Sequence, residues 1–176
     1  MGVVPVEGRG SLPFALHHGE ALVTLASWAL EAAGVELLDF TSRWADVRAR
    51  ATTLVVHDPL CPGVPVPFLR EAVAAAADGS VVVGSRPVTD TVKSLDDGVV
   101  GETVDRSGLV AVTSPVVLPP EVVAALDRWP DLADLGHLVT TLRDRFEVTF
   151  LEAPPTGRRV VDESDLALIA ASAVAD

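Results

Sequence analysis

The sequence predicts an α/β domain with a mostly parallel sheet and helices on both faces. Apolar residues make up 49% of the 176 residues and aromatic residues only 5%, so the core must consist mainly of Val, Leu and Ala. Segments typical of strands and helices alternate along the chain, which favours this fold class. The alternation is interrupted once, at Pro87–Leu109, by a stretch typical of a hairpin. The length suits a single domain over residues 1–176.

The chain opens with a strand, a glycine loop and a helix. The apolar run Val3–Val6 is followed by the turn Glu7–Ser11, and Glu20–Ala33 then places apolar residues on one helical face, with Gly34 at its end. A loop of this kind can offer backbone N–H groups to a phosphate. Two glycines after a strand are as often only a turn, so both interpretations stay open.

The next segments predict two further strands. Val35–Phe40 is a strand candidate, Thr41–Ala51 predicts a short helix or an irregular crossover, and Thr52–Val56 is a β-branched run of the buried parallel type. This third strand leads to Asp58. Ligands in open α/β sheets bind beyond the carboxyl ends of strands, which favours a ligand role for Asp58. The alternative is that Asp58 caps a turn ahead of Pro59.

The rest of the chain continues the alternation. The expected elements are a helix at Pro65–Ala77, strands at Ser80–Val83 and Val110–Val112, helices at Pro119–Leu126 and Asp131–Phe146, a strand at Glu147–Leu151, and a final helix at Asp165–Val174. Asp162 or Ser164 is expected to cap the final helix.

The interrupting stretch has a clear turn signal. Asp96-Asp97-Gly98 followed by Val99-Val100 predicts a β-hairpin. The stretch carries Arg106 and Lys93, the only lysine of the chain. An ordinary surface hairpin would explain this pattern. A hairpin that reaches a charged ligand or a partner subunit would explain it as well.

Composition narrows the function classes. The net charge of −12 argues against a nucleic-acid partner, because phosphate backbones are bound by cations. The single cysteine, Cys61, builds neither a disulfide framework nor a cysteine zinc cluster, which suits a reducing cytoplasm. No segment has the length of a membrane span or the pattern of a signal peptide. His17, His18 and His137 lack partners at metal-ligand spacing, so we expect no protein-built metal site.

Four candidate site positions lie where this topology places strand ends. They are the Gly8/Gly10 loop, Asp58, the group Thr91, Arg106 and Thr113, and the pair Arg158 and Arg159. Cations directed at one pocket are what the binding or transfer of a phosphoryl group requires, since the protein must position and neutralise charge. The pattern therefore favours a phosphate-handling site.

Several of these residues lie in motifs of a known family. Thr89–Lys93 (TDTVK) and Glu102–Leu109 (ETVDRSGL) resemble the 2-C-methyl-D-erythritol 4-phosphate cytidylyltransferase family. Val3–Gly10 resembles its opening strand and glycine loop, Val55–Asp58 its VHD strand end, and Arg159–Leu166 its closing segment. The resemblance covers most of the chain, and its most specific part is the hairpin.

The resemblance implies a fold, an activity and an assembly. The fold would be a Rossmann-like three-layer sandwich, here one nucleotidyltransferase-like domain with a hairpin dimerisation arm at about residues 87–109. The activity would be transfer of CMP from CTP to 2-C-methyl-D-erythritol 4-phosphate, with Mg²⁺, in the non-mevalonate isoprenoid pathway. The protein would be a cytoplasmic homodimer whose arm reaches the neighbouring active site.

The matching positions also imply residue roles. Thr91 and Arg106 would hold the sugar phosphate from the partner chain, and Asp58 and Thr113 would hold the polyol hydroxyls. The CTP phosphates would lie against Gly8, Gly10 and Ser11. Arg159 takes the position of a substrate-contacting lysine, and Arg9 is the candidate replacement for a missing loop cation; these two are the expected catalytic residues.

The chain departs from the family where the family has catalytic cations. Leu12 stands at the position of an arginine, and Pro13-Phe14 replaces a Pro-Lys pair. One such donor contributes several kcal/mol to lowering a barrier, on the order of 3. Cys61 stands at another arginine, and Thr41–Ala51 is too short to contain the cytidine-reading segment.

Two hypotheses of different class follow. One is a cytidylyltransferase with weakened or lost catalysis. The other is a non-catalytic dimeric paralogue that acts as a binding or regulatory protein. Transfer of a different nucleotide has no positive support from the residues.

Overall fold

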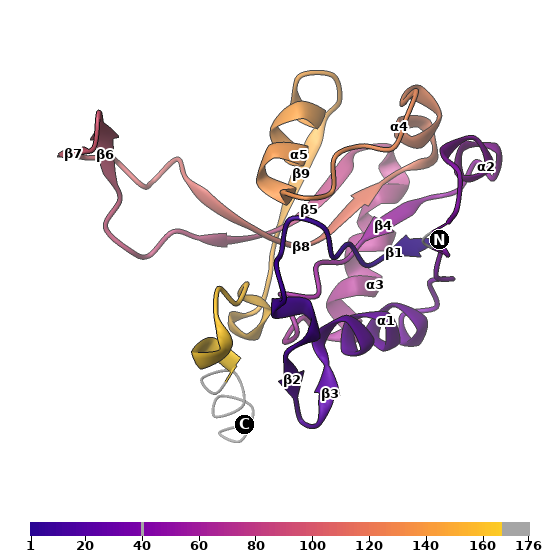
Figure 1. Ribbon diagram of the computed structural model, residues 1–176. Helices are drawn as coiled ribbons and strands as arrows, with labels where there is room; N and C mark the ends of the chain where they lie inside the picture. The colour runs from indigo at the N-terminus through magenta and orange to yellow at the C-terminus, as the bar shows by residue number, and fades with distance from the viewer. Residues whose placement is uncertain (40, 167–176) are drawn as a thin grey trace.

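The computed structural model describes residues 1–39 and 41–166 (Figure 1). Its centre is a five-stranded sheet in the order β1-β4-β8-β5-β9. The strands are β1 Gly2–Val3, β4 Leu54–Val56, β8 Val110–Leu118, β5 Val81–Pro87 and β9 Val148–Glu152. β8 is antiparallel to both of its neighbours, while β1 is parallel to β4 and β5 is parallel to β9. The predicted mostly parallel sheet is therefore confirmed.

Helices cover both faces of the sheet, so the predicted three-layer arrangement is confirmed. One face packs against α1 Leu22–Ala32 and α3 Val66–Ala75, and the other against α2 Trp44–Ala49, α4 Pro120–Ala125 and α5 Leu135–Arg143. Alternate strand residues supply the two cores. Leu54 and Val56 face α2, α4 and α5, whereas Val55 faces α1 and α3. The continuous Val and Leu runs arise because these strands are buried on both faces.

The predicted strand at Val35–Phe40 is wrong. The segment forms a single bridge, between Leu37 and Gly2, and Phe40 lies outside the described residues. The Gly2 amide donates to the Glu36 carbonyl at 2.8 Å, and the Leu38 amide donates to the Gly2 carbonyl at 2.8 Å. The chain then turns at Asp39, whose carboxylate accepts from the Thr41 amide at 2.7 Å. The pairing is short because β1 has only two residues.

β8 is longer than predicted and contains a bulge. The strand was expected at Val110–Val112 but continues to Leu118. Its register against β5 shifts between Val83 and Ser85, so three residues of β8 lie opposite Gly84. A Cβ at Gly84 would lie 2.5 Å from the Ser114 carbonyl oxygen, so the bulge requires glycine there. Bulges re-aim side chains next to sites, and this one directs Ser114 towards the end of β4.

Several predicted helices are confirmed with shifted ends. α5 begins at Leu135 instead of Asp131, because Asp134 caps it and accepts from the Gly136 amide at 2.8 Å. α1 begins at Leu22, because an unexpected 3₁₀ helix, Leu12–Phe14, and a small hairpin precede it. The hairpin strands are β2 Leu16–His17 and β3 Glu20–Ala21. No helix among the described residues is long and apolar enough to cross a membrane.

The final predicted helix is described only at its start. Residues 163–166 are helical, and the remainder of Asp165–Val174 lies outside the described residues. Asp162 accepts from the Ser164 and Asp165 amides at 2.9 and 3.1 Å, so it is the cap.

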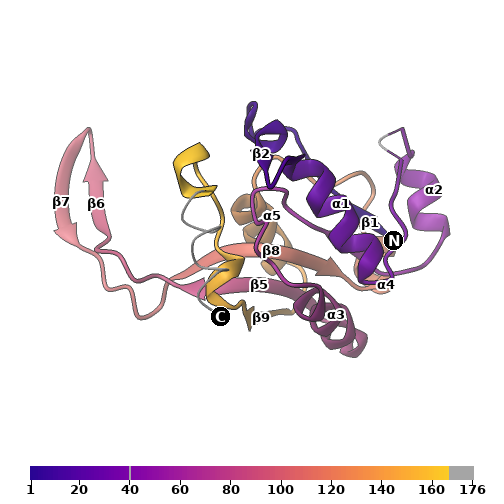
Figure 2. The same cartoon turned by 90° about the horizontal axis from the view of Figure 1, so that it is seen from below.

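The predicted hairpin forms an arm that projects away from the sheet (Figures 1 and 2). It consists of β6 Lys93–Asp96 and β7 Val99–Thr103. Asp97 and Gly98 join the strands, and both have positive φ, 49° and 79°, as a type I′ turn requires. The arm continues from the ends of β5 and β8, so it is carried by two adjacent strands of the main sheet.

Candidate functional site

Asp58 lies directly after β4 and is the centre of a buried ionic cluster. Only 1% of its side chain is exposed. Its Oδ1 accepts from Arg9 Nε at 2.8 Å and from the Leu60 amide at 3.0 Å. Its Oδ2 accepts from Arg159 Nε at 3.0 Å. Asp58 therefore caps its own turn, as one of the two sequence interpretations predicted, and also pairs with two arginines; its role towards a ligand stays a prediction.

Arg9 connects the glycine loop to two other parts of the fold. Its side chain is fully buried, and its Nη1 donates to the Glu7 carbonyl at 2.6 Å and to the Leu132 carbonyl at 2.9 Å. Its Nη2 is buried and has no hydrogen-bond partner among the described residues. Arg9 thus ties the loop to the end of β4 and to the segment before α5.

The two glycines beside Arg9 have different structural roles. Gly8 has a φ of 75°, and a Cβ there would lie 2.8 Å from the Cβ and the carbonyl oxygen of Ala133. Gly10 has a φ of 59°, but a Cβ there would meet nothing within 4 Å. Gly8 is therefore required for close packing as well as for backbone conformation, whereas Gly10 serves the conformation alone.

Arg159 approaches Asp58 from the other side and is 39% exposed. Its position follows from the next residue, because the Val160 amide donates to the Leu60 carbonyl at 2.7 Å. The neighbouring Arg158 pairs instead with Asp165. Only one of the two adjacent arginines therefore belongs to the cluster.

The cluster keeps Asp58 ionised. Burial by itself would raise the pKa of this carboxyl, but the hydrogen bond and charge of Arg9 outweigh burial, with help from the Leu60 amide and Arg159. The net result is a pKa below the usual value. One carboxylate faces two guanidinium groups, so one positive charge remains uncompensated at this edge of the sheet.

His57 and Ser114 form hydrogen-bond contacts beside the Asp58 cluster. The Asp58 amide donates to Ser114 Oγ at 3.0 Å, and the same oxygen contacts His57 Nδ1. Burial lowers the pKa of His57 to about 4, although the charge of Asp58 acts in the opposite direction. His57 is therefore neutral at pH 7. The role of Ser114 was not predicted, because only the bulge in β8 brings it to Asp58.

The structure places the other predicted site residues in two regions. Thr113 lies on β8 beside Ser114, and its buried Oγ1 has no partner among the described residues. Gly8, Gly10 and Ser11 form the loop that carries Arg9. Thr91 and Arg106 belong to the arm, outside the five-stranded sheet. Arg106 donates to the Thr89 carbonyl and lines a cavity of about 470 Å³ at the base of the arm, beside Arg86 and Phe150.

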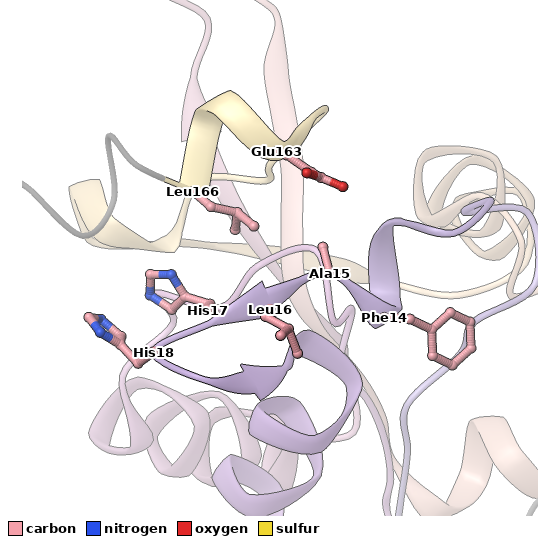
Figure 3. Close-up of a pocket in the computed structure, with 7 residues that line it drawn as sticks. All are labelled: Phe14, Ala15, Leu16, His17, His18, Glu163 and Leu166. Atoms are coloured by element: carbon pink, nitrogen blue, oxygen red, sulfur yellow. The ribbon is translucent and has the colours of Figure 1, made fainter.

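The residues that the resemblance places at cation positions of the family differ in their surroundings. Leu12 packs against a small apolar cluster that contains Leu60 and Val160. Cys61 is buried in the core under α3, and burial raises the pKa of its thiol. Phe14 is 59% exposed and lines a cavity of about 610 Å³ beside the β2–β3 hairpin. Figure 3 shows Phe14 directed away from the two histidines, with Glu163 and Leu166 across the cavity.

The described residues provide no protein-built metal site. Among residues 1–39 and 41–166, no group of three or more His, Cys, Asp or Glu side chains lies close enough together to hold a metal ion. Both oxygens of Asp58 are also already occupied by N–H donors. A metal ion near Asp58 would therefore need its other ligands from a bound molecule rather than from these side chains.

Comparison with known proteins finds relatives that are similar in sequence. A 2-C-methyl-D-erythritol 4-phosphate cytidylyltransferase from Shouchella clausii is 31% identical over 121 residues, which cover 66% of this chain and 52% of that protein. The enzyme of the same name from Symbiobacterium thermophilum is 40% identical over 86 residues, which cover 47% of this chain and 36% of that protein. The chain thus spans about half the length, or less, of the curated relatives that it matches.

Solved structures share the fold. The 2-C-methyl-D-erythritol 4-phosphate cytidylyltransferase from Thermus thermophilus superposes with a TM-score of 0.68 at 20% identity, covering 99% of this chain and 98% of that one. The 4-diphosphocytidyl-2C-methyl-D-erythritol synthase from Anaerococcus prevotii also gives a TM-score of 0.68, at 13% identity, over 98% and 95% of the two chains. The model of the family matches residues 43–168, which is most of the chain. The Rossmann-like α/β fold, the sequence relatives and this match together show that the chain belongs to the 2-C-methyl-D-erythritol 4-phosphate cytidylyltransferase family.

Proposed function

We propose that this protein transfers the cytidylyl group of CTP to 2-C-methyl-D-erythritol 4-phosphate, as a step of isoprenoid biosynthesis, at a reduced rate. The observation that carries the proposal is the Asp58 cluster beneath the glycine loop, in a chain of this family. The names of the sequence relatives support this choice of substrates. The pathway is proposed to operate in the cytoplasm.

The reaction needs positioning and charge neutralisation. A phosphate oxygen of the acceptor attacks the α-phosphorus of CTP, a new P–O bond forms, and pyrophosphate leaves with the electron pair of the broken P–O bond. Arg9 and Arg159 are the proposed cations for these phosphates, and the amides at Gly8, Gly10 and Ser11 are the proposed hydrogen-bond donors. Asp58 and Thr113 are assigned to the polyol hydroxyls, and the unpartnered Oγ1 of Thr113 supports its role.

Mg²⁺ enters the proposal only as the counter-ion of the CTP phosphates. The described residues do not fit a protein-held metal, because Asp58 is fully engaged and no cluster of three ligands exists among them. No chemical step of this chain is assigned to the metal.

The reduced rate follows from the residues at the glycine loop. Leu12 packs in an apolar cluster and Phe14 is exposed, so neither supplies the charge that a family arginine or lysine would supply. Losing two electrostatic donors is expected to remove most of the rate, because each contributes about 3 kcal/mol.

A second candidate is a non-catalytic dimeric binding or regulatory protein. The observation that favours it is that Asp58 already occupies Nε of both Arg9 and Arg159. In both candidates we propose a homodimer formed through the arm, in which Thr91 and Arg106 serve the neighbouring subunit.

Turnover and binding measurements separate the two candidates. With CTP, Mg²⁺ and methylerythritol phosphate, pyrophosphate release above background supports the enzyme. Arg159→Gln should lower that rate at least about tenfold, whereas Arg158→Gln should not, because Arg158 pairs with Asp165 outside the cluster. CTP binding without turnover would favour the second candidate. Binding of neither CTP nor methylerythritol phosphate would contradict the proposed activity.

A further inference from the structure

Arg9 is buried with part of its hydrogen-bonding capacity unused. A guanidinium group has five N–H donors, and the two on Nη2 have no partner among the described residues. A buried donor without an acceptor costs stability, so an oxygen-bearing group is expected beside it. The same side chain has satisfied contacts at Nε and Nη1, which fix its orientation.

Asp58 and a bound anion would compete for Arg9. The carboxylate takes Arg9 Nε and also Arg159 Nε, so it neutralises one of the two positive charges. An anionic ligand with several oxygens that displaces the carboxylate gains Arg9 Nε and the unpartnered Nη2 donors together. Fork-like guanidinium groups bind phosphate oxygens well because two parallel donors match two acceptors.

Glycines on both sides of Arg9 give the loop backbone freedom. Gly8 and Gly10 lie on either side of Arg9, and both have positive φ. Glu7, Gly10 and Ser11 are exposed, whereas the Arg9 side chain is buried and Gly8 lies close to Ala133. Breaking the Arg9–Asp58 pair would remove the link between the loop and the end of β4, while the Arg9 bonds to the Leu132 and Ala133 carbonyls would remain.

We propose that the Arg9–Asp58 ion pair is a latch over an oxyanion site, and that a polyphosphate opens it by competing with Asp58 for Arg9. Asp58 is thus a built-in competitor of the ligand, and the closed form is the resting state. The inference rests on the proposed function only in naming the polyphosphate as that of a nucleotide.

Inorganic triphosphate tests the latch without any nucleotide chemistry. Its affinity should be measured by titration calorimetry for the whole protein in metal-free buffer. Asp58→Asn should bind about tenfold more tightly than wild type, because the competing charge is gone. Arg9→Gln should lose the binding. Arg158→Gln, which removes one nearby charge outside the cluster, should bind as wild type does.

A second variant decides the matter if Asp58→Asn fails to fold. Asp58→Ser removes the same competing carboxylate, so it should also bind triphosphate about tenfold more tightly than wild type, and unchanged or weaker binding by a folded Asp58→Ser would overturn the latch. Unchanged or weaker binding by a folded Asp58→Asn would overturn the latch. Triphosphate binding that is unchanged in Arg9→Gln would also overturn the latch, because the ligand would then not use Arg9 and water alone would satisfy Nη2. Triphosphate cannot donate CMP, so failed turnover with CTP and failed latch opening are separate results.

Discussion

At the scale of single residues, His57 shows how burial sets a chemical state. Its ring contacts Ser114 Oγ, which also accepts from the Asp58 amide, and burial favours the neutral form of the imidazole. The Asp58 cluster therefore has an uncharged histidine beside it at pH 7. This arrangement makes the stability of the protein depend on pH between the unfolded and folded pKa values of the histidine.

We predict that the free energy of unfolding falls as the pH is lowered from about 6.5 to about 4. The pKa of His57 is depressed to about 4 in the folded protein, from 6.5 when unfolded, so over this window the unfolded chain binds a proton that the folded chain does not. The loss amounts to about 3 kcal/mol. The contribution of Asp58, whose pKa is also lowered, is present above about 3.8 and is lost only at lower pH.

Urea unfolding at several pH values measures this dependence. His57→Gln should be less stable at pH 7 but should lose most of the slope between pH 6.5 and 4. His137→Gln, on α5 and away from the cluster, is the matched control and should retain the slope. An unchanged slope in His57→Gln would show that another group is responsible.

The two loop glycines provide a matched pair of substitutions. Gly8→Ala should destabilise the protein by about 3 kcal/mol, because a Cβ there meets Ala133 at 2.8 Å and the φ is positive. Gly10→Ala should cost only about 1 kcal/mol, because it has the positive φ without the contact. Equal losses of unfolding free energy would contradict this distinction.

At the scale of elements, the strand pair β5 and β8 carries both the bulge and the arm. The bulge brings Ser114 to Asp58, and the same strand pair extends outward as the arm. The arm exposes large apolar side chains, of which Leu95 and Val99 are each 68% exposed. Apolar side chains gathered on an exposed hairpin are typical of an interface.

We predict that Leu95→Asp shifts the protein from dimer to monomer, with the fold retained. The substituted side chain packs against no buried core, so the loss should appear in sedimentation velocity and not in circular dichroism. Glu102→Gln on β7 changes a charge on the same arm and serves as the control. A wild-type protein that sediments as a monomer at micromolar concentration would contradict the proposed assembly.

At the scale of the whole molecule, an acidic chain brings two arginines together at one edge of its sheet. The net charge is −12, yet Arg9 and Arg159 meet at a single carboxylate. The sequence singled out all three residues, because each follows a strand or stands in a family motif. Their mutual pairing was not predicted, since Asp58 lies 49 residues from Arg9 and 101 from Arg159.

Local signals by themselves determined the α/β class, the buried strands and the arm. The Asp97-Gly98 turn requires no distant partner, and the Val runs follow from burial on both faces. Only the tertiary structure decided that Val35–Phe40 does not form a strand, that β8 bulges opposite Gly84, and that Arg9 is held by Asp58. The reason is physical: these outcomes depend on which backbone groups and charges meet across the fold, and no spacing along the chain encodes such meetings.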